Sequence, residues 1–122
     1  MIDRWERAVS VGDFHWVDLP AANGCEQRGC RPAAVLQDDD YGGDLPVVLV
    51  VSLTTARVAM RFAGTTPIRP TAENGLRQGS VALVFQLRAI DRRRIQELIG
   101  TVRAEVLNAM FEELGKLMGR SV

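Results

Sequence analysis

The densest group of chemically capable side chains lies in residues 24–32, which read Gly-Cys-Glu-Gln-Arg-Gly-Cys-Arg-Pro. The segment supplies one carboxylate (Glu26), one amide (Gln27) and two guanidinium groups (Arg28 and Arg31). Guanidinium forks bind phosphates and carboxylates through paired hydrogen bonds. The segment is therefore a candidate anion-binding site. The alternative is a polar loop whose arginines pair with the aspartates of a neighbouring turn.

Common signatures of enzymes and metal sites are missing from the sequence. It has no phosphate-binding G-x-x-x-x-G-K-[ST], no H-E-x-x-H and no G-x-S-x-G. The only histidine, His15, is predicted to be structural. Cys25 and Cys30 lack both C-x-x-C spacing and the four ligands of structural zinc, so reduced thiols are expected. Side chains of the consecutive aspartates 38–40 alternate in direction on an extended chain, so we predict no metal site and no cofactor.

Length and composition limit the class of protein. A chain of 122 residues, 47% hydrophobic and 25% charged, is expected to form one globular domain. Its 15 basic and 15 acidic residues cancel, so an anionic partner must be met by a local cluster of arginines. The sequence shows no signal peptide and no apolar run of membrane-spanning length, so a cytoplasmic location is expected.

Apolar patterning predicts short strands followed by helices. Residues 47–53, Val-Val-Leu-Val-Val-Ser-Leu, predict a strand covered on both faces. After Asp91 the apolar spacing changes to a near-helical period. We therefore expect an α+β domain with a small curled antiparallel sheet or barrel. The expected elements are strands at 14–19, 33–36, 47–53 and 80–90, a loop at 21–29, a surface turn at 38–44, an edge strand or irregular piece within 59–70, a short helix between Asp91 and Gly100, and a second helix capped by Thr101 that continues to about residue 118.

Five short motifs follow one another along the chain: Gly12-Asp13 with Trp16-Val17-Asp18, Glu26-Gln27-x-Gly29-x-Arg31-Pro32-x-x-Val35-Leu36, Ser52-Leu53-Thr54-Thr55, Gly79-Ser80-Val81, and Gln86-x-Arg88-x-Ile90-Asp91. In this order they resemble the MazF/PemK (Kid) toxin family. The Glu-Gln-x-Gly-x-Arg-Pro motif is the most specific of the five. The resemblance implies a single toxin domain over 1–122, with 1–11 as an N-terminal arm or short helix.

The resemblance also implies a fold, an activity and partners. The fold would be an SH3-like barrel with C-terminal helices. The activity would be that of a metal-independent endoribonuclease toxin that cuts single-stranded RNA at short recognition sequences. Its products would carry 2′,3′-cyclic phosphate and 5′-hydroxyl ends. The partners would be a second copy in a homodimer and an antitoxin whose disordered acidic segment blocks the RNA groove.

Three residues are candidates for catalysis by this resemblance. Arg31 resembles the catalytic arginine of the family, and a guanidinium suits the charge that grows on a phosphate in the transition state. Thr54 resembles the catalytic threonine, whose hydroxyl can donate to a phosphoryl oxygen. Glu26 is a candidate base only if burial raises its pKa, and Arg28 and Arg31 oppose that. Shaping the loop or binding RNA is the preferred role for Glu26.

Further residues are candidates for binding RNA, and others depart from the family pattern. Gln86 matches a family glutamine that can read a base edge, and Gln27, Arg28, Ser80 and Arg88 are candidates for other contacts with RNA. The departures are Cys25 where some relatives carry histidine, Phe85 where they carry an acidic residue, and Leu83 and Phe85 where some rely on an arginine and an aspartate.

The departures leave two alternatives to a fully active ribonuclease. One is a toxin of the same fold that acts by binding a protein, as gyrase poisons do. The other is a catalytically weakened homologue. For the ribonuclease, the sequence predicts charge separation, because Arg28 and Arg31 stand apart from the aspartates of 38–44. A shallow dependence of RNA affinity on salt is the expected consequence.

Overall fold

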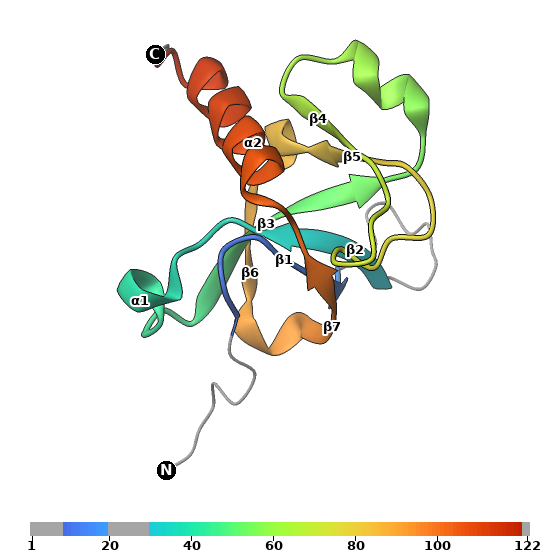
Figure 1. Cartoon of the computed structure of the whole chain (residues 1–122). Helices are drawn as coiled ribbons and strands as arrows, with labels where there is room; N and C mark the ends of the chain where they lie inside the picture. The colour runs from blue at the N-terminus through green and yellow to red at the C-terminus, as the bar shows by residue number, and fades with distance from the viewer. Residues whose placement is uncertain (1–8, 20–29, 121–122) are drawn as a thin grey trace.

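The computed structural model describes residues 9–19 and 30–120. Strands come first along the chain and one long helix comes last (Figure 1). This order confirms the predicted α+β class. The elements are β1 (Asp13–Asp18), β2 (Cys30–Val35), α1 (Asp39–Gly42), β3 (Val47–Thr54), the 3₁₀ helix η2 (Arg57–Arg61), β4 (Thr65–Ile68), β5 (Ser80–Leu83), η3 (Val84–Gln86), β6 (Arg88–Asp91), η4 (Arg92–Arg94), β7 (Ile95–Thr101) and α2 (Ala104–Leu117).

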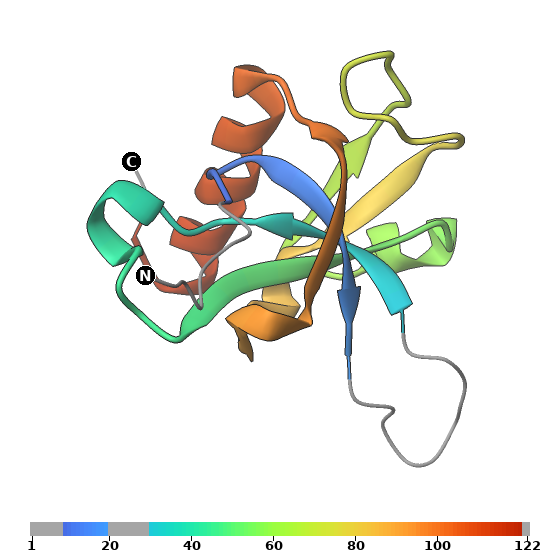
Figure 2. The ribbon, with the colours of Figure 1, turned by 90° about the horizontal axis from the view of Figure 1, so that it is seen from below.

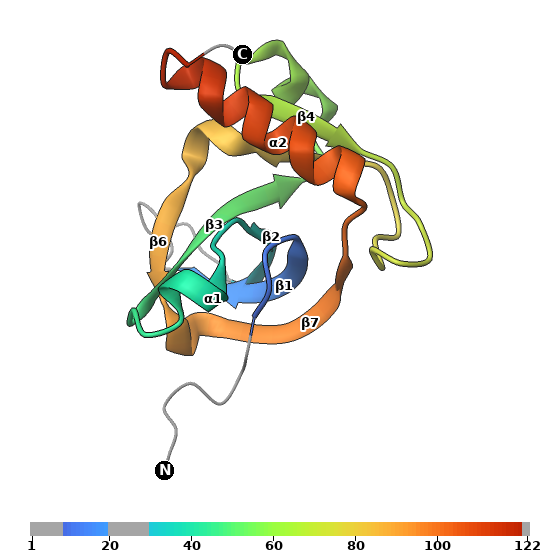
Figure 3. The ribbon, with the colours of Figure 1, turned by 60° about the vertical axis from the view of Figure 1, so that its left-hand side comes forward.

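All strand pairs are antiparallel. The strand order is β4-β5-β3-β2-β1-β7, and β6 pairs with the first half of β3. The sheet curls strongly, so that β7 and β6 swing round towards each other (Figure 3). No ladder joins β6 to β7 in the described residues, so the sheet forms an open barrel. A curled antiparallel sheet was expected from the sequence and is confirmed.

The sheet separates two apolar cores. On one face, α2 packs over residues that include Phe14, Val51 and Leu53, and Met110 of α2 is fully buried there. On the other face, Val48 and Val50 belong to a second core. Because successive side chains of a strand alternate in direction, β3 supplies both cores. The prediction that residues 47–53 form a strand covered on both faces is confirmed, although Leu49 remains partly exposed. Figure 2 shows α2 lying along one side of the sheet.

The segment predicted as one strand over 80–90 is divided in two. β5 and β6 lie along the same edge of β3, with η3 between them. Leu53 faces Ala82, whereas Val50, three residues earlier, faces Arg88. Between these two pairs, the β5–β6 segment therefore has three more residues than β3, and the turn of η3 accommodates them. Within 59–70, β4 is an edge strand, as expected.

The predicted short helix between Asp91 and Gly100 is wrong, because this segment forms η4 and the strand β7. β7 pairs with β1, where Val17 faces Ile95 and Phe14 faces Gly100. Pairing along this otherwise free edge of β1 satisfies the backbone groups of both strands, and a helix would leave those of β1 without partners. The predicted cap at Thr101 is also wrong: Thr101 ends β7, and Arg103 is the N-cap of α2.

The predicted surface turn at 38–44 contains a buried polar network. Asp38 caps α1 by accepting a hydrogen bond from the Asp40 amide (2.9 Å). The guanidinium of Arg92, whose side chain is 3% exposed, donates to both carboxylate oxygens of Asp39 (2.9 and 3.1 Å) and to two backbone carbonyls. The Gln37 amide donates to the carbonyls of Gly42 and Val47. We call Gln37, Asp39 and Arg92 the polar clasp, because they join α1 to β3 and η4.

Candidate active site

Arg31 and Thr54 come from neighbouring strands. In the β2–β3 ladder, Ala33 faces Ser52. Continuing that register by two residues places Arg31 opposite Thr54, at the end of β3. Directly opposed side chains lie on the same face of a sheet, with Cβ atoms about 5 Å apart. The fold thus brings together the two residues that the sequence assigned to catalysis.

Their local surroundings suit a site for a phosphate. Arg31 is exposed and forms no ion pair within the described part of the chain, so the aspartates of 38–44 do not neutralise it. Thr54 is half-buried, and its Oγ1 accepts a hydrogen bond from the Ala56 amide (3.1 Å). A hydroxyl that accepts one bond still carries a proton to donate. The pair therefore offers a positive charge and an oriented hydroxyl donor on one face.

The row that contains this pair continues across the sheet. Thr54 faces Val81 of β5, and Val81 faces Pro67 of β4. Arg31, Thr54, Val81 and Pro67 therefore form one cross-strand row on the face opposite α2. We call it the site row. Arg88 lies on the same face, because it faces Val50 along the edge of β3 that also carries β5.

The other described RNA candidates lie in different surroundings. Ser80 is buried, and its hydroxyl donates to the Gln78 carbonyl (3.2 Å). Gln86 is exposed at the end of η3. Beside it, Phe85 packs edge to face with Phe62, with the ring centroids 5.8 Å apart. Gln86 therefore lies next to an exposed aromatic pair rather than in the site row.

Three predicted site residues, Glu26, Gln27 and Arg28, lie outside the described residues, as does Cys25. They belong to the segment that joins β1 to β2. Because Arg31 follows that segment directly, the chain order keeps Glu26 and Arg28 within five residues of the site row.

His15 is a second titratable group on this face. Its ring is 2% exposed, and its Nδ1–H donates to the Gln96 carbonyl (2.9 Å). Its Nε2 lies 3.8 Å from Asp13 Oδ2 and has no hydrogen-bond partner among the described atoms. His15 faces Ala33, two residues from Arg31 on β2. The His15 side chain is therefore buried on the same face as the site row, and its hydrogen bond joins β1 to β7.

Within residues 9–19 and 30–120, no group of three or more His, Cys, Asp or Glu side chains could hold a metal ion. In the same ranges, no helix has the length and apolar character needed to cross a bilayer.

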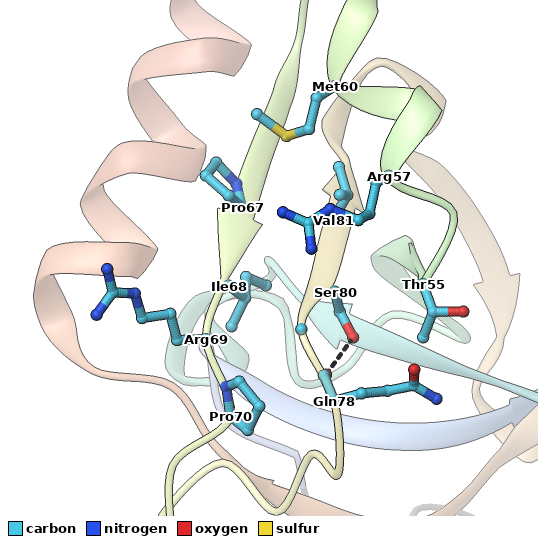
Figure 4. A pocket seen from close by; sticks show the side chains of 11 residues that line it. Thr55, Arg57, Met60, Pro67, Ile68, Arg69, Pro70, Gln78, Ser80 and Val81 are labelled. Atoms are coloured by element: carbon cyan, nitrogen blue, oxygen red, sulfur yellow. Dashed lines mark hydrogen bonds between the residues drawn. The ribbon is translucent and has the colours of Figure 1, made fainter.

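Sequence reasoning missed a cavity at the β4–β5 end of the site row. Its volume is about 510 Å³, within the range typical of ligand pockets. Figure 4 shows the guanidinium of Arg57 extending between Pro67 and Val81, with Met60 above them. We call this cavity the flank pocket. Its lining residues are Thr55, Arg57, Met60, Pro67, Ile68, Arg69, Pro70, Gln78, Gly79, Ser80 and Val81.

One buried asparagine holds a wall of the flank pocket. Asn74 is 3% exposed; its amide donates to the Arg69 carbonyl (2.8 Å), and its Oδ1 accepts from the Thr71 and Leu76 amides. A Cβ at Gly75, which has a φ of +71°, would clash with the Ile99 carbonyl oxygen. The segment after β4 therefore packs tightly on β7. Thr-x-x-Asn-Gly is a turn signal in the sequence, but it does not reveal what the turn supports.

Comparison with known proteins agrees with this architecture. The chain is 30% identical over 106 residues to Endoribonuclease EndoA of Bacillus subtilis (strain 168), a match that covers 87% of this chain and 90% of that protein. It superposes on a crystal structure of MazE-MazF (form II) from Deinococcus radiodurans with a TM-score of 0.75 and 27% identity, covering 95% of this chain and 100% of that one.

A third relative shares the fold at lower identity. The Mycobacterium tuberculosis toxin MazF-mt6 gives a TM-score of 0.71 at 24% identity and covers 90% of this chain and 99% of that one. At the level of the family, residues 10–118 match the PemK-like, MazF-like toxins of type II toxin–antitoxin systems. The match spans β1 to the end of α2 and includes the whole site row. The chain therefore belongs to this toxin family.

Proposed function

We propose that this protein is a metal-independent endoribonuclease toxin that cleaves single-stranded RNA. The proposal is carried by the register of β2 and β3, which puts Arg31 opposite Thr54 when it is continued by two residues beyond the pair Ala33–Ser52. The 30% identity with an endoribonuclease over most of the chain supports the same reaction class.

In the proposed reaction, the 2′-hydroxyl of a nucleotide attacks the adjacent phosphorus, and the bond from phosphorus to the 5′-oxygen breaks. The products are a 2′,3′-cyclic phosphate and a 5′-hydroxyl. The proton leaves the 2′-oxygen, and the departing 5′-oxygen gains one. The nucleophile belongs to the RNA, so the protein needs only to stabilise charge and move protons.

Arg31 and Thr54 stabilise the charge that develops on the phosphate. The fork of Arg31 binds the phosphate oxygens and stabilises the negative charge that grows on them. Thr54 donates its hydroxyl proton to a phosphoryl oxygen while its oxygen is held by the Ala56 amide. Glu26 is retained as the candidate proton acceptor. Gln27, Arg28, Gln86 and Arg88 are proposed to contact the RNA.

The proposed partners follow from the family. We infer that the protein acts as a homodimer and is neutralised by an antitoxin whose acidic segment competes with RNA for arginines. The MazE-MazF structures from Deinococcus radiodurans support an antitoxin partner. Two-fold pairing is the commonest assembly of small proteins of this kind.

A cleavage assay in EDTA tests the proposal. Purified protein is incubated with a long unstructured RNA, and the ends of the products are identified. We expect Arg31→Ala to lower the cleavage rate by about 10²–10³, the usual cost of one preorganised anion stabiliser. Arg103→Ala, at an exposed arginine before α2, is the control and should cleave normally. Failure of the wild-type protein to cleave a sequence-diverse RNA, or full activity of Arg31→Ala, would refute the proposal.

A further inference from the structure

The flank pocket lies on the same face as the candidate catalytic pair. Val81 and Pro67, two of its lining residues, follow Thr54 in the site row. Neighbouring strands are about 4.8 Å apart, so the pocket begins one to two strand spacings, about 5–10 Å, from Thr54. A strand of RNA whose phosphate lies between Arg31 and Thr54 therefore has a neighbouring nucleotide within reach of the pocket.

The lining combines apolar walls with positive charge. Met60, Ile68 and Val81 supply aliphatic surface, and Pro67 and Pro70 supply flat rings. Arg57 and Arg69 supply guanidinium groups that form no ion pair within the described part of the chain. No acidic residue lines the pocket among the residues described. The electrostatics thus favour an anion, and the walls favour a planar apolar group.

A nucleotide unites both properties in one ligand. Its base has two apolar faces and a polar edge, and its phosphate is anionic. Proteins bind the bases of single-stranded RNA by stacking them on aromatic rings or on arginine planes and by hydrogen bonding to their edges. In the pocket, the guanidinium of Arg57 lies between Pro67 and Val81, and the Gln78 side chain extends on the side of Thr55 (Figure 4).

We propose that the flank pocket takes up a nucleobase of the RNA adjacent to the phosphate that is cut, with Arg57 stacking on the base and Gln78 reading its edge. This inference rests on the proposed function. It makes residues 57 and 78 determinants of sequence preference, and it gives Arg69 a phosphate contact.

Preorganisation of the pocket supports this role. Asn74 fixes the Arg69 carbonyl, and the buried Ser80 hydroxyl fixes the Gln78 carbonyl at 3.2 Å. Ile68, Ser80 and Val81 are each less than 10% exposed, so the floor is part of the packed sheet. A ligand entering such a pocket loses less affinity to ordering of the protein than one that must organise a loose loop.

The first test is binding without cleavage. The four nucleoside 3′-monophosphates are titrated separately into ¹⁵N-labelled protein, with inorganic phosphate as the comparison. We expect saturable shifts of the Gly79, Ser80 and Val81 amide signals with at least one nucleotide, and smaller shifts with phosphate alone. Met60→Trp should abolish these shifts by filling the cavity. Met118→Trp, at an exposed methionine beyond α2, should preserve them.

Three outcomes of this titration would overturn the inference. They are the absence of shifts with every nucleotide at up to about 10 mM, unchanged binding by Met60→Trp when its spectrum shows a folded protein, and shifts with an acidic peptide but with none of the four nucleotides. The last outcome would identify a protein-docking site instead.

The second test is the sequence profile of cleavage. A pool of randomised RNA is cut, and the 5′-hydroxyl ends are sequenced. We expect Gln78→Ala to relax the base preference at one position next to the cut by about tenfold and to leave the other positions unchanged. An unaltered cleavage profile in Gln78→Ala would show that Gln78 does not recognise the base. If the wild-type protein cuts no RNA while nucleotides still fill the pocket, the proposed function falls and the binding site stands.

Discussion

The polar clasp and the site row each contain an arginine, and they differ in whether its guanidinium is bound within the protein. In the polar clasp, Arg92 is buried and donates hydrogen bonds to both carboxylate oxygens of Asp39 and to the backbone carbonyls of Gly42 and Leu45. In the site row, Arg31 is exposed and has no ion-pair partner in the described chain. A guanidinium whose donors are used within the protein stabilises the fold. One whose donors face solvent is available to a ligand.

The largest expected difference between these regions is in stability. Arg92→Ala leaves the Asp39 carboxylate partly buried without its cation, so we expect it to lower the free energy of unfolding by about 3–5 kcal/mol. Urea denaturation measures this change. Arg93→Ala, at the neighbouring arginine whose side chain is 80% exposed, should change it by less than about 0.5 kcal/mol. Equal losses of unfolding free energy in the two variants would show that the pairing of Arg92 with Asp39 makes no special contribution to stability.

Within the site row, the hydroxyl of Thr54 should matter for the rate rather than for the fold. Thr54→Val keeps the shape and removes a donor to a charged phosphate, so we expect the cleavage rate to fall about 10–100-fold. Single-turnover cleavage measures the effect. Thr101→Val, at an exposed threonine at the end of β7, serves as the matched control. A normal rate in Thr54→Val would remove the hydroxyl from the mechanism.

The clasp should also respond to acid. The hydrogen bonds from Arg92 lower the pKa of Asp39 below its ordinary value of 3.8. Because the folded-state pKa is depressed, Asp39 stabilises the fold fully above the unfolded-state pKa, and this contribution is lost as the pH falls through the folded-state pKa. Melting temperatures between pH 6 and pH 2 should therefore fall more steeply for the wild type than for Asp39→Asn. Parallel curves would contradict this assignment.

The smallest effect concerns salt. With few exposed arginines near the site row and no net charge on the chain, we expect log affinity for an uncleavable 2′-O-methyl RNA to fall with log salt with a slope of about −2, or roughly three phosphate contacts. Arg69→Ala should reduce the slope by about 0.7. Fluorescence anisotropy at several salt concentrations measures both. A slope steeper than about −5 would mean that the protein presents a much larger basic surface than the site row.

Much of the site was predictable because it depends on local pattern. Arg31 precedes a short apolar strand and Thr54 ends the most apolar run in the chain, and their resemblance to the catalytic residues of the MazF/PemK family is what singled them out. The flank pocket was not predicted. Arg57, Pro67 and Gln78 are ordinary loop and edge residues in the sequence, and only the β4–β5 pairing gathers them around one space.

The sequence by itself predicted the strand at 47–53, strand structure that begins at residue 80, and the amphipathic helix near the end, and its motifs carried the family resemblance that pointed to Arg31 and Thr54. The tertiary structure decided that residues 95–101 form a strand. It also decided which of the three consecutive arginines at 92–94 is buried. Ile95, Leu98 and Ile99 have helical spacing, and pairing with the free edge of β1 overrides it and forms the strand. Arg92, and neither of its neighbours, is buried because only its side chain reaches Asp39. Both decisions depend on partners distant in sequence, 53 residues away for Arg92 and Asp39, which local periodicity does not encode.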